Sequence, residues 1–387
     1  RRLHRFHQAC DLLYRQSCRG RAPSWIAEWL DAGKPADLIA FARARPLVNQ
    51  LPRIIRPDLL LTDHGWALAE IDSVPGGIGL TAWLQENYAR LGHPVLGGPT
   101  GMRHAFHQLL PKGPVVISEE ASAYQPEWEW LLGPQRIIAL DSFRDWSTPA
   151  YRFFESFEWE ACPTLRTGLD PAHPLTPPLK PFLEEKLWLA LFWLPALRHF
   201  WRCQLGDRYD RDLRQIIPQS WIVEPTPLPP TAVLPGLNAH SWEQVGQFSR
   251  SERNLVLKVS GYSPQAWGSR GVLVGTDVGN EQWAAAIAQA LAEFPRQPRI
   301  LQRFHKATSF THPYWDPHRQ TLIPMHGRAR VCPYYFVQPD DTVLLAGVLV
   351  TFCPEDKKLL HGMEDAILAP AQPQTTPQPS PGLPLAP

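Results

Sequence analysis

The sequence predicts an α/β fold with additional α+β elements, and three stretches carry this prediction. Residues 113–140 alternate between a short apolar strand, a turn, a helix from Pro126 to Gly133 and a second apolar strand, which is typical of a small parallel sheet. Residues 54–81 have the pattern of a β-hairpin followed by a glycine-rich run and a helix. Residues 254–294 have the pattern of strand, glycine-bearing loop, strand and amphipathic helix. We therefore expect several lobes that each combine strands with helices.

Length and composition indicate a globular protein of two or three lobes. The chain has 387 residues, of which 44% are hydrophobic and 19% are charged, so it can bury a substantial core. Its net charge of +1 and the lack of a run of eighteen apolar residues favour neither nucleic acid nor a membrane as a partner. Six scattered cysteines without a C-x-x-C pair are typical of reduced thiols, so we expect a cytoplasmic protein. Because the sequence starts at Arg1 and not at Met, we also expect a trimmed or partial chain.

The segment IIRPDLLLTDHGWALAEID, residues 54–72, predicts a hairpin that gathers charge on one face. Residues 63–65 form a three-residue connection that ends in glycine, which is a favoured hairpin loop. With Thr62 paired to Trp66, side-chain alternation puts four charged residues on the same face. These are Asp58 opposite Glu70, and Arg56 opposite Asp72.

These three carboxylates predict a metal site. At this spacing each pair repels by roughly 4 kcal/mol at an effective dielectric of about 20, unless a cation lies among them. Ligation by oxygen alone suits Mg²⁺ that carries nucleotide phosphates, so Asp58, Glu70 and Asp72 are the predicted ligands. The alternative is a solvated hairpin in which Arg56 pairs with Asp58 and Asp72. The run SVPGGIGLT at 73–81 favours the binding site, because glycines let the backbone approach a ligand closely.

A second candidate site lies in NLVLKVSGYSPQAWGSRGVLVG, residues 254–275. Lys258 ends an apolar strand, where its ammonium group can reach a phosphate while its stem lies along the sheet. Gly268, Ser269 and Gly271 follow in a loop whose backbone N–H groups can fold over phosphate oxygens. The alternative is an ordinary edge-strand lysine.

The C-terminal third predicts more strands, with two arginines on one face. Residues 299–306 form an apolar strand, and residues 327–337 and 341–353 form an antiparallel pair. Arg328 and Arg330 alternate onto one face of this pair, where they either serve a triphosphate or form salt bridges at the rim.

The chain divides into five predicted parts. Residues 183–205 form a strongly apolar helix that is bent or broken at Pro195. The proline-rich stretch at 163–182 is predicted to be an extended connector, and the proline-rich tail has little to bury. The parts are an N-terminal helical segment at 1–50, the hairpin with the α/β unit at 51–162, the connector at 163–182, further lobes at 183–369 and a disordered tail at 370–387.

In their order along the chain, these motifs resemble the ATP-grasp superfamily, and specifically its circularly permuted branch typified by glutathionylspermidine synthase. In that branch an R-x-D element precedes an E-x-N element, and the corresponding residues are Arg56, Asp58, Glu70 and Asp72, with Asp72 in place of the usual Asn. The family's two nucleotide lysines and the hinge strand beside its adenine look like Lys186, Lys258 and Leu301 to Phe304.

The resemblance implies ATP-grasp-like nucleotide lobes and a small pre-grasp α/β domain. It also implies ATP and Mg²⁺ as cofactors of a ligase that forms an acyl phosphate from a small-molecule or peptide carboxylate, which an amine or another nucleophile then attacks. Arg56, as stabiliser of the phosphorylated carboxylate, and Arg330 are the implied catalytic residues. The implied nucleotide contacts are Lys186, Lys258, Gly268, Ser269, Gly271, Gln302 and Phe304.

Two other classes of protein remain open. One is a degenerate, non-catalytic ATP-binding protein. The other is an interaction scaffold without a nucleotide site, which the 42 prolines and 16 tryptophans motivate.

Overall fold

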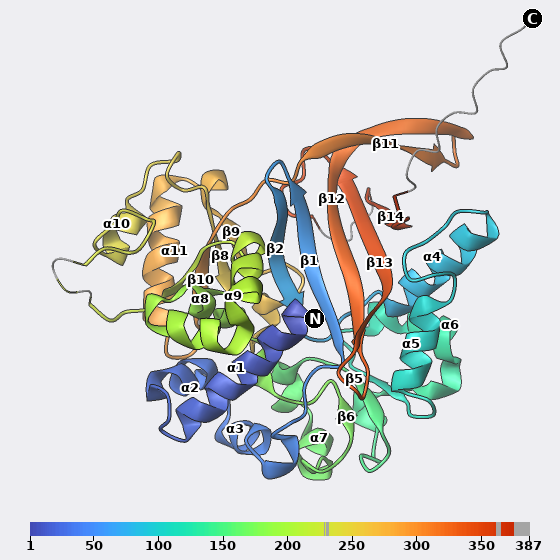
Figure 1. Cartoon of the computed structure of the whole chain (residues 1–387), viewed down its shortest axis with the longest axis horizontal. Coiled ribbons are helices and arrows are strands. Elements are labelled where there is room, and N and C mark those ends of the chain that lie inside the picture. The colour runs from blue at the N-terminus through green and yellow to red at the C-terminus, as the bar shows by residue number, and fades with distance from the viewer. Residues whose placement is uncertain (228, 230–231, 361–364, 375–387) are drawn as a thin grey trace, which may run out of the picture.

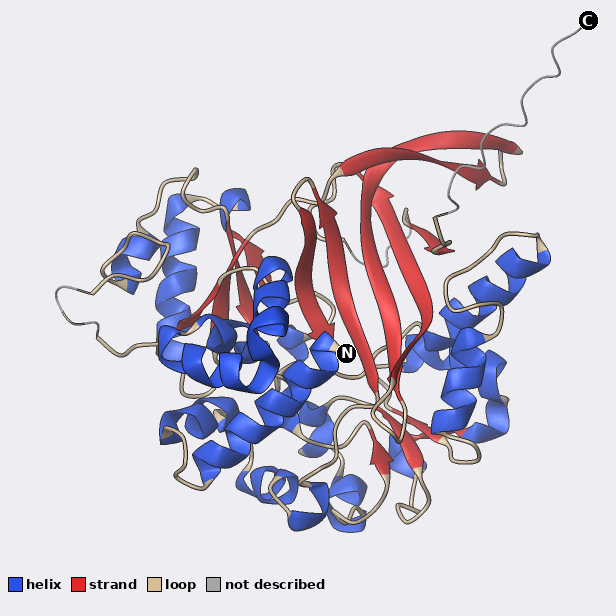
Figure 2. Ribbon diagram, viewed as in Figure 1, coloured by secondary structure: helices blue, strands red, loops and turns tan. Residues whose placement is uncertain are grey.

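The computed structural model describes residues 1–227, 229, 232–360 and 365–374. Over these residues the chain folds into three β-sheets with helices packed around them (Figure 1, Figure 2). The mixed α/β class predicted from the sequence is confirmed. Among the described residues, no helix combines the length and the apolar character that crossing a membrane requires.

The central sheet joins the two ends of the chain. Its strand order is β14-β13-β12-β1-β2, with β11 paired to the first half of β12, and all neighbours are antiparallel (Figure 1). Ile54 lies opposite Phe336 and Leu60 opposite Arg330, so the predicted hairpin and the predicted C-terminal strand pair form one sheet. The strands are β1 (Ile54–Thr62), β2 (Gly65–Asp72), β11 (Ser309–Asp316), β12 (Thr321–Val337), β13 (Val343–Pro354) and β14 (Ile367–Pro370).

A parallel sheet carries the strand and helix alternation predicted for residues 113–140. Its order is β4-β3-β5-β6, with the strands β3 (Val115–Ile117), β4 (Ile137–Ala139), β5 (Ala150–Phe153) and β6 (Leu175–Thr176). Phe106 and Trp128 pack on Tyr151 of β5 at ring-centroid distances of 5.2 and 5.3 Å. The helices nearby are α4 (Ile78–Arg90), α5 (Gly101–Leu109), α6 (Gln125–Leu132) and α7 (Pro163–Gly168).

The third sheet contains the predicted strand, glycine loop and strand. Its order is β7-β10-β8-β9, and its neighbours are antiparallel. Buried Trp283 of the covering helix packs with Leu255 and Leu301 of the sheet. The elements are β7 (Ser220–Val223), β8 (Leu255–Val259), β9 (Val272–Val274), β10 (Arg299–Arg303), α10 (Trp242–Gly246) and α11 (Asn280–Glu293).

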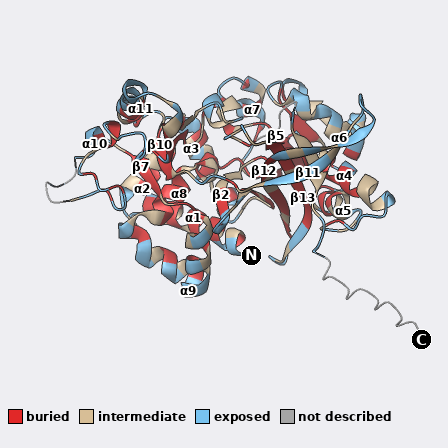
Figure 3. Ribbon diagram, turned by 90° about the horizontal axis from the view of Figure 1, so that it is seen from above, coloured by how far each residue is buried: buried red, intermediate tan, exposed pale blue. Residues whose placement is uncertain are grey.

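Five helices form a separate aromatic core beside the third sheet, and Figure 3 draws much of this region as buried. They are α1 (Arg2–Cys18), α2 (Ser24–Asp31), α3 (Ala36–Ala42), α8 (Leu187–Trp193) and α9 (Arg198–Ile216). Phe6, Phe192 and Trp201 meet at ring-centroid distances of 5.4–5.5 Å. The apolar stretch at 183–205 is broken at Pro195 as predicted, since α8 ends two residues before it.

The structure divides the chain differently from the predicted boundaries. The hairpin pairs with β12, which the prediction placed in the part at 183–369, although Ile54 still shares a core with Val115 and Ile117 of the parallel sheet. The predicted connector at 163–182 contains α7 and β6, because Leu175 pairs in parallel with Ala150. The predicted tail begins inside β14, where Pro370 lies opposite Leu349. Most of that tail, residues 375–387, lies outside the described residues.

Candidate functional site

The β1–β2 hairpin places the predicted charges opposite one another. Asp58 pairs with Glu70 and Arg56 pairs with Asp72, as predicted. The turn differs from the prediction, because Thr62 lies opposite Gly65 and the connection therefore has two residues instead of three. A bulge between Asp58 and Leu59 restores the predicted register by inserting one extra residue of β2.

The extra residue in the bulge is Ala69, and it anchors the predicted phosphate lysine. Its carbonyl oxygen accepts a hydrogen bond from Lys258 Nζ at 2.8 Å. Lys258 Nζ also donates to Gln302 Oε1 on the neighbouring strand at 2.9 Å. The bulge thus connects the central sheet to the third sheet at the point where the cationic side chain lies. β-bulges commonly adjust the direction of a backbone group in this way.

Arginines neutralise two of the three predicted metal ligands. Arg56 forms ion pairs with Asp72 and, through Nε, with Asp58 Oδ1 at 3.2 Å. Arg330 Nη1 binds Asp58 Oδ2 at 3.0 Å, so both oxygens of this 1% exposed carboxylate are occupied. Burial would lower the pKa of Arg56, but Asp58 and Asp72 outweigh it and raise that pKa well above its ordinary value. Both arginine contacts of the solvated-hairpin alternative are therefore present, although Asp58 is buried.

Glu70 is the carboxylate that remains accessible. Its side chain is 34% exposed, and its nearest cation is Lys186, whose Nζ lies 3.4 Å from Oε2. Burial would raise the pKa of Glu70, but Lys186 and Lys258, followed by Arg56 and Arg330, lower it to about 2. Burial lowers the pKa of Lys258 to about 8, although Glu70 opposes this shift. Glu70 is therefore ionised at neutral pH, and Lys258 is mostly protonated.

Within the described ranges, no three His, Cys, Asp or Glu side chains are grouped so that they could hold a metal ion. Asp58 and Asp72 face arginines, and Glu70 is the most accessible of the three carboxylates, at 34% exposure against 22% for Asp72. This donor set does not form a protein cage for a free ion. It fits a Mg²⁺ that arrives with a nucleotide, because such an ion keeps water and phosphate ligands and takes one or two carboxylates.

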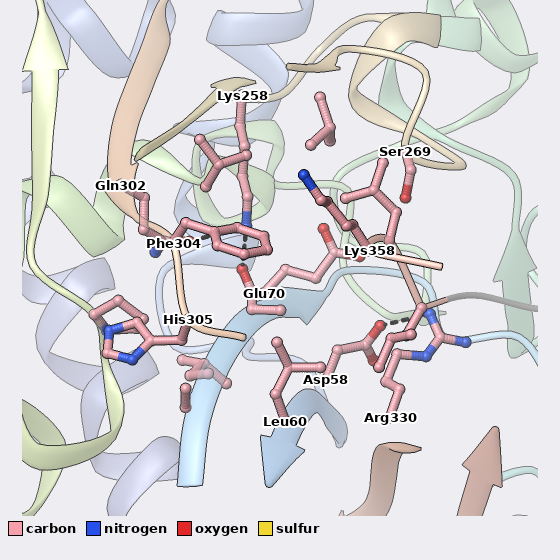
Figure 4. A pocket seen from close by; sticks show the side chains of 18 of the residues that line it. Asp58, Leu60, Glu70, Lys258, Ser269, Gln302, Phe304, His305, Arg330 and Lys358 are labelled. Atoms are coloured by element: carbon pink, nitrogen blue, oxygen red, sulfur yellow. Dashed lines mark hydrogen bonds and ion pairs between the residues drawn. The ribbon is translucent and has the colours of Figure 1, made fainter. Parts of the chain in front are cut away.

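Two cavities meet at these residues. The first lies between the hairpin and the third sheet, and apolar side chains such as Leu60, Val256 and Phe304 line it together with Lys258 (Figure 4). The second, of about 300 Å³, lies between the hairpin and the glycine loop. Both cavities are lined by Glu70, Ser269 and Arg330. A ligand long enough to occupy both would pass this set of charges.

Most of the predicted site residues line these cavities, and one does not. The first contains Asp58, Glu70, Lys258, Ser269, Gln302, Phe304 and Arg330, and the second adds Arg56, Asp72, Lys186 and Gly268. Gly271 instead closes the base of the loop, where its N–H donates to Gln265 O at 2.7 Å. A Cβ at this position would lie 2.7 Å from Val259 Cγ2, so the glycine permits close packing. Arg328, the neighbour of Arg330 on the same face, lines neither cavity. Its Nη2 forms an ion pair with Glu355 Oε1 at a distance of 3.1 Å.

Sequence reasoning missed several lining residues of the second cavity. Glu155 lies two residues after β5, at the carboxyl end of a parallel strand, where ligands of such sheets commonly bind. Burial, followed by the charges of Glu184 and Asp72, raises the pKa of Glu155 to about 8, so it holds a proton at neutral pH. Recognising residues 150–153 as a strand would have revealed it. The aromatic members are Tyr124, Phe157, Tyr262 and Trp267.

Comparisons with known proteins support the fold. No protein-family model matches the sequence, and neither does any curated protein. Among solved structures, the chain is similar to an apo glutathione synthetase-like effector from Globodera pallida, with a TM-score of 0.50 and 9% identity over 95% of this chain and 83% of that one. It is also similar to a protein provisionally named gamma-glutamylcysteine synthetase from Methylobacillus flagellatus KT, with a TM-score of 0.44 and 11% identity over 92% of this chain and 89% of that one.

The first of these similarities indicates the class of the fold. The first gives this chain a glutathione synthetase-like fold, and at 9% identity it concerns the fold alone. The TM-score of the second is too low to support an argument. The predicted fold class is confirmed, whereas membership of the circularly permuted ATP-grasp branch stays a prediction.

Proposed function

We propose that this protein is an ATP- and Mg²⁺-dependent ligase that joins a carboxylate to an amine or another nucleophile through an acyl phosphate. The observation that carries the proposal is the convergence of four cations around accessible Glu70, where the two cavities meet. These cations are Arg56, Lys186, Lys258 and Arg330. Four positive and three negative side chains leave an excess of positive charge, which suits a polyphosphate.

The lysines and the first cavity supply the proposed nucleotide contacts. Lys186 at the start of α8 and Lys258 of β8 are the cations that act most strongly on Glu70, so both can contact phosphates beside it. The apolar lining around Phe304 favours a flat base, and Gln302 beside it binds Lys258 Nζ. Gly268 and Ser269 both adopt left-handed conformations at φ +61, and their loop forms one wall of the second cavity. This arrangement supports the proposed phosphate-covering role of the loop.

Mg²⁺ would be held chiefly by Glu70, together with nucleotide phosphates. When bound, it would neutralise charge on the transferring phosphoryl group. The protein's own part is electrostatic. Arg56 and Arg330 stay charged throughout, because both have raised pKa values, and both line the second cavity, where an acyl phosphate would form. Protonated Glu155 lies in the second cavity, where the carboxylate and the nucleophile would meet, and can donate a hydrogen bond there.

A degenerate ATP-binding protein is the second candidate. The observation in its favour is that both oxygens of Asp58 are occupied by other side chains, so this carboxylate is not available to a metal without rearrangement. Such a protein would bind ATP without turning it over.

Two measurements test the proposal. Thermal unfolding with Mg-ATP separates ATP-binding proteins from a scaffold, because a ligand at one hundred times its dissociation constant adds about 2.7 kcal/mol. ADP release that requires both a carboxylate and an amine then separates the ligase from the degenerate protein. An unchanged melting temperature at millimolar Mg-ATP would contradict both candidates. We also propose that the protein is cytoplasmic and that its substrates are a small-molecule or peptide carboxylate and an amine.

A further inference from the structure

A buried ion pair lies behind the proposed nucleotide site. Lys34, in the turn between α2 and α3, donates from Nζ to Glu185 Oε1 at 2.5 Å and to Leu30 O at 2.7 Å. Both charged side chains are essentially inaccessible, at 0% and 1% exposure. The second oxygen of Glu185 accepts a hydrogen bond from Ser260 Oγ. This network connects the N-terminal helical segment to the start of α8 and the end of β8.

The same network fixes the backbone next to both proposed phosphate lysines. Ser260 O accepts a hydrogen bond from Lys186 N at 2.9 Å, and Ser260 Oγ accepts one from Leu187 N at 2.8 Å. Ser260 follows Lys258 by two residues along the same chain segment. Glu185 immediately precedes Lys186. A shift of Glu185 or Ser260 would therefore displace the main chain that carries Lys186 and Lys258.

Two glycines make room for this arrangement. Gly33 has φ +73, and a Cβ there would lie 1.8 Å from Arg296 O, so only glycine lets the turn before Lys34 press on that backbone. A Cβ on Gly261 would lie 2.8 Å from the Glu185 carboxylate. Lys34 Nζ also lies 5.6 Å from the ring centre of Tyr262, which lines the second cavity. The network therefore reaches the base of the glycine loop as well.

We propose that Lys34 is a positioning residue of the nucleotide site, acting through Glu185 and Ser260 on Lys186 and Lys258. This inference rests on the proposed function. Stability alone does not account for the pair, because a buried ion pair is often no more stabilising than apolar side chains of the same volume. Its charged hydrogen bonds have fixed distances and directions, which is what placing two lysines against one ligand requires.

The test compares Lys34→Met with a matched control, Lys180→Met. Lys180 Nζ forms a similarly buried ion pair with Asp11 Oδ1 at 2.8 Å, and it too connects to the N-terminal helical segment. Its contacts do not include Ser260 or Lys186. In Lys34→Met, Glu185 is left as a buried charge without its partner, which can prevent folding. The double variant Lys34→Met/Glu185→Gln removes both charges and is therefore expected to fold.

Two readouts are taken on each folded variant: ATP affinity by calorimetry, and amide exchange at Lys186 and Leu187 without nucleotide. We expect Lys34→Met to weaken ATP binding about tenfold and to speed both amides, because a small displacement of binding groups is costly. We expect Lys180→Met to change neither, and the double variant to fall between Lys34→Met and wild type.

The inference would be overturned if Lys34→Met and the double variant kept the ATP affinity and the amide exchange rates of the wild type. This holds even if their melting temperatures changed. Equal weakening by Lys180→Met would overturn it too, since any lost buried pair would then suffice. If the wild-type protein binds no ATP, the proposed function fails by itself. The exchange rates at Lys186 and Leu187 still decide whether Lys34 holds this backbone.

Discussion

The two sides of the candidate site differ in how firmly they are held. On the hairpin side, β1 is paired along both edges, and Asp58 is buried between two arginines. On the loop side, Gly268 adopts φ +61, and a Cβ there would meet no atom within 4 Å. The loop is held to the parallel-sheet lobe by an exposed pair between Arg270 and Glu120 at 2.7 Å, and to α8 by Lys186 Nζ, which donates to Ala266 O at 2.9 Å. The charged side chains of the hairpin are thus held in place, whereas the backbone of the glycine loop opposite them has room to move. This arrangement suits closure of the loop over a ligand.

The largest effect is expected on the fixed side, from Asp58→Asn. Losing this charge leaves Arg56 and Arg330 without their shared buried partner, so the free energy of unfolding should fall by about 3–5 kcal/mol. Urea denaturation measures this loss. Asp63→Asn in the exposed turn of the same hairpin is the control and should change stability by less than about 0.5 kcal/mol. Equal losses in the two variants would remove the contrast between the buried and the exposed parts of the hairpin.

Glu70→Gln should act on turnover more than on folding. This side chain is 34% exposed, and it is the carboxylate available to a nucleotide-borne metal ion. We expect ATP turnover to fall about 100-fold, equivalent to about 2.7 kcal/mol in the barrier. Its urea midpoint should fall less than that of Asp58→Asn, because the attraction to Lys186 and Lys258 is lost at a partly exposed position. Wild-type turnover would remove Glu70 from the proposed metal site.

Lys258→Met should weaken ATP binding more than Lys186→Met. Lys258 is buried and bound to the bulge at Ala69, whereas Lys186 is partly exposed, lies 3.4 Å from Glu70 and donates to the loop at Ala266 O. A hydrogen bond to a charged group contributes about 1.5–3 kcal/mol, so the loss at Lys258 should reach at least about tenfold. Calorimetric titration of both variants decides the order. The reverse order would place the phosphates nearer to the loop side.

The depressed pKa of Lys258 predicts opposite pH effects on binding and on stability. ATP affinity should fall as pH rises through about 8, because the ammonium loses its proton. Without ATP, stability should rise between pH 8 and 10.5, since the unfolded chain then holds the proton that the folded chain has released. Lys258→Met should lack both changes. Titrations and melts from pH 7 to 10.5 test the pair, and a parallel rise or fall of both quantities would contradict it.

The smallest effect concerns the loop at 263–271. Its backbone amides should exchange quickly without nucleotide and severalfold more slowly with Mg-ATP, while the amides of β1 should not change. Hydrogen exchange with mass spectrometry measures both segments in one experiment. Protection of the loop already present without ATP would mean that the two sides of the site are equally rigid.

Local signals predicted much of this site. The predicted pairs of Asp58 with Glu70 and Arg56 with Asp72 are confirmed, although they were derived from a turn one residue too long, and the proline rule located the break at Pro195. The bulge at Ala69 was not predictable from the sequence. A three-residue turn without a bulge gives the same pairing of Asp58 with Glu70 and Arg56 with Asp72 as a two-residue turn with one. The bulge turns the Ala69 carbonyl oxygen toward Lys258 Nζ, and this contact is visible only in the folded structure.

Long-range contacts account for the rest. Arg330 reaches Asp58 across 272 residues, and nothing near either residue indicates the other. The same holds for Lys34 and Glu185, which are 151 residues apart. Three carboxylates close in sequence predicted a metal site, but the arginine brought in by β12 changes how those carboxylates are used.

The pairing of β1 with β12 also determines when the site can form as the chain is synthesised. β1 leaves the ribosome 272 residues before the arginine that completes its charge cluster. At roughly 5–20 residues per second, this delay is on the order of half a minute. During that time one edge of the hairpin has no strand beside it, and open strand edges invite pairing with other chains. Nascent chains of this protein should therefore depend on a chaperone until the strand at 321–337 has emerged.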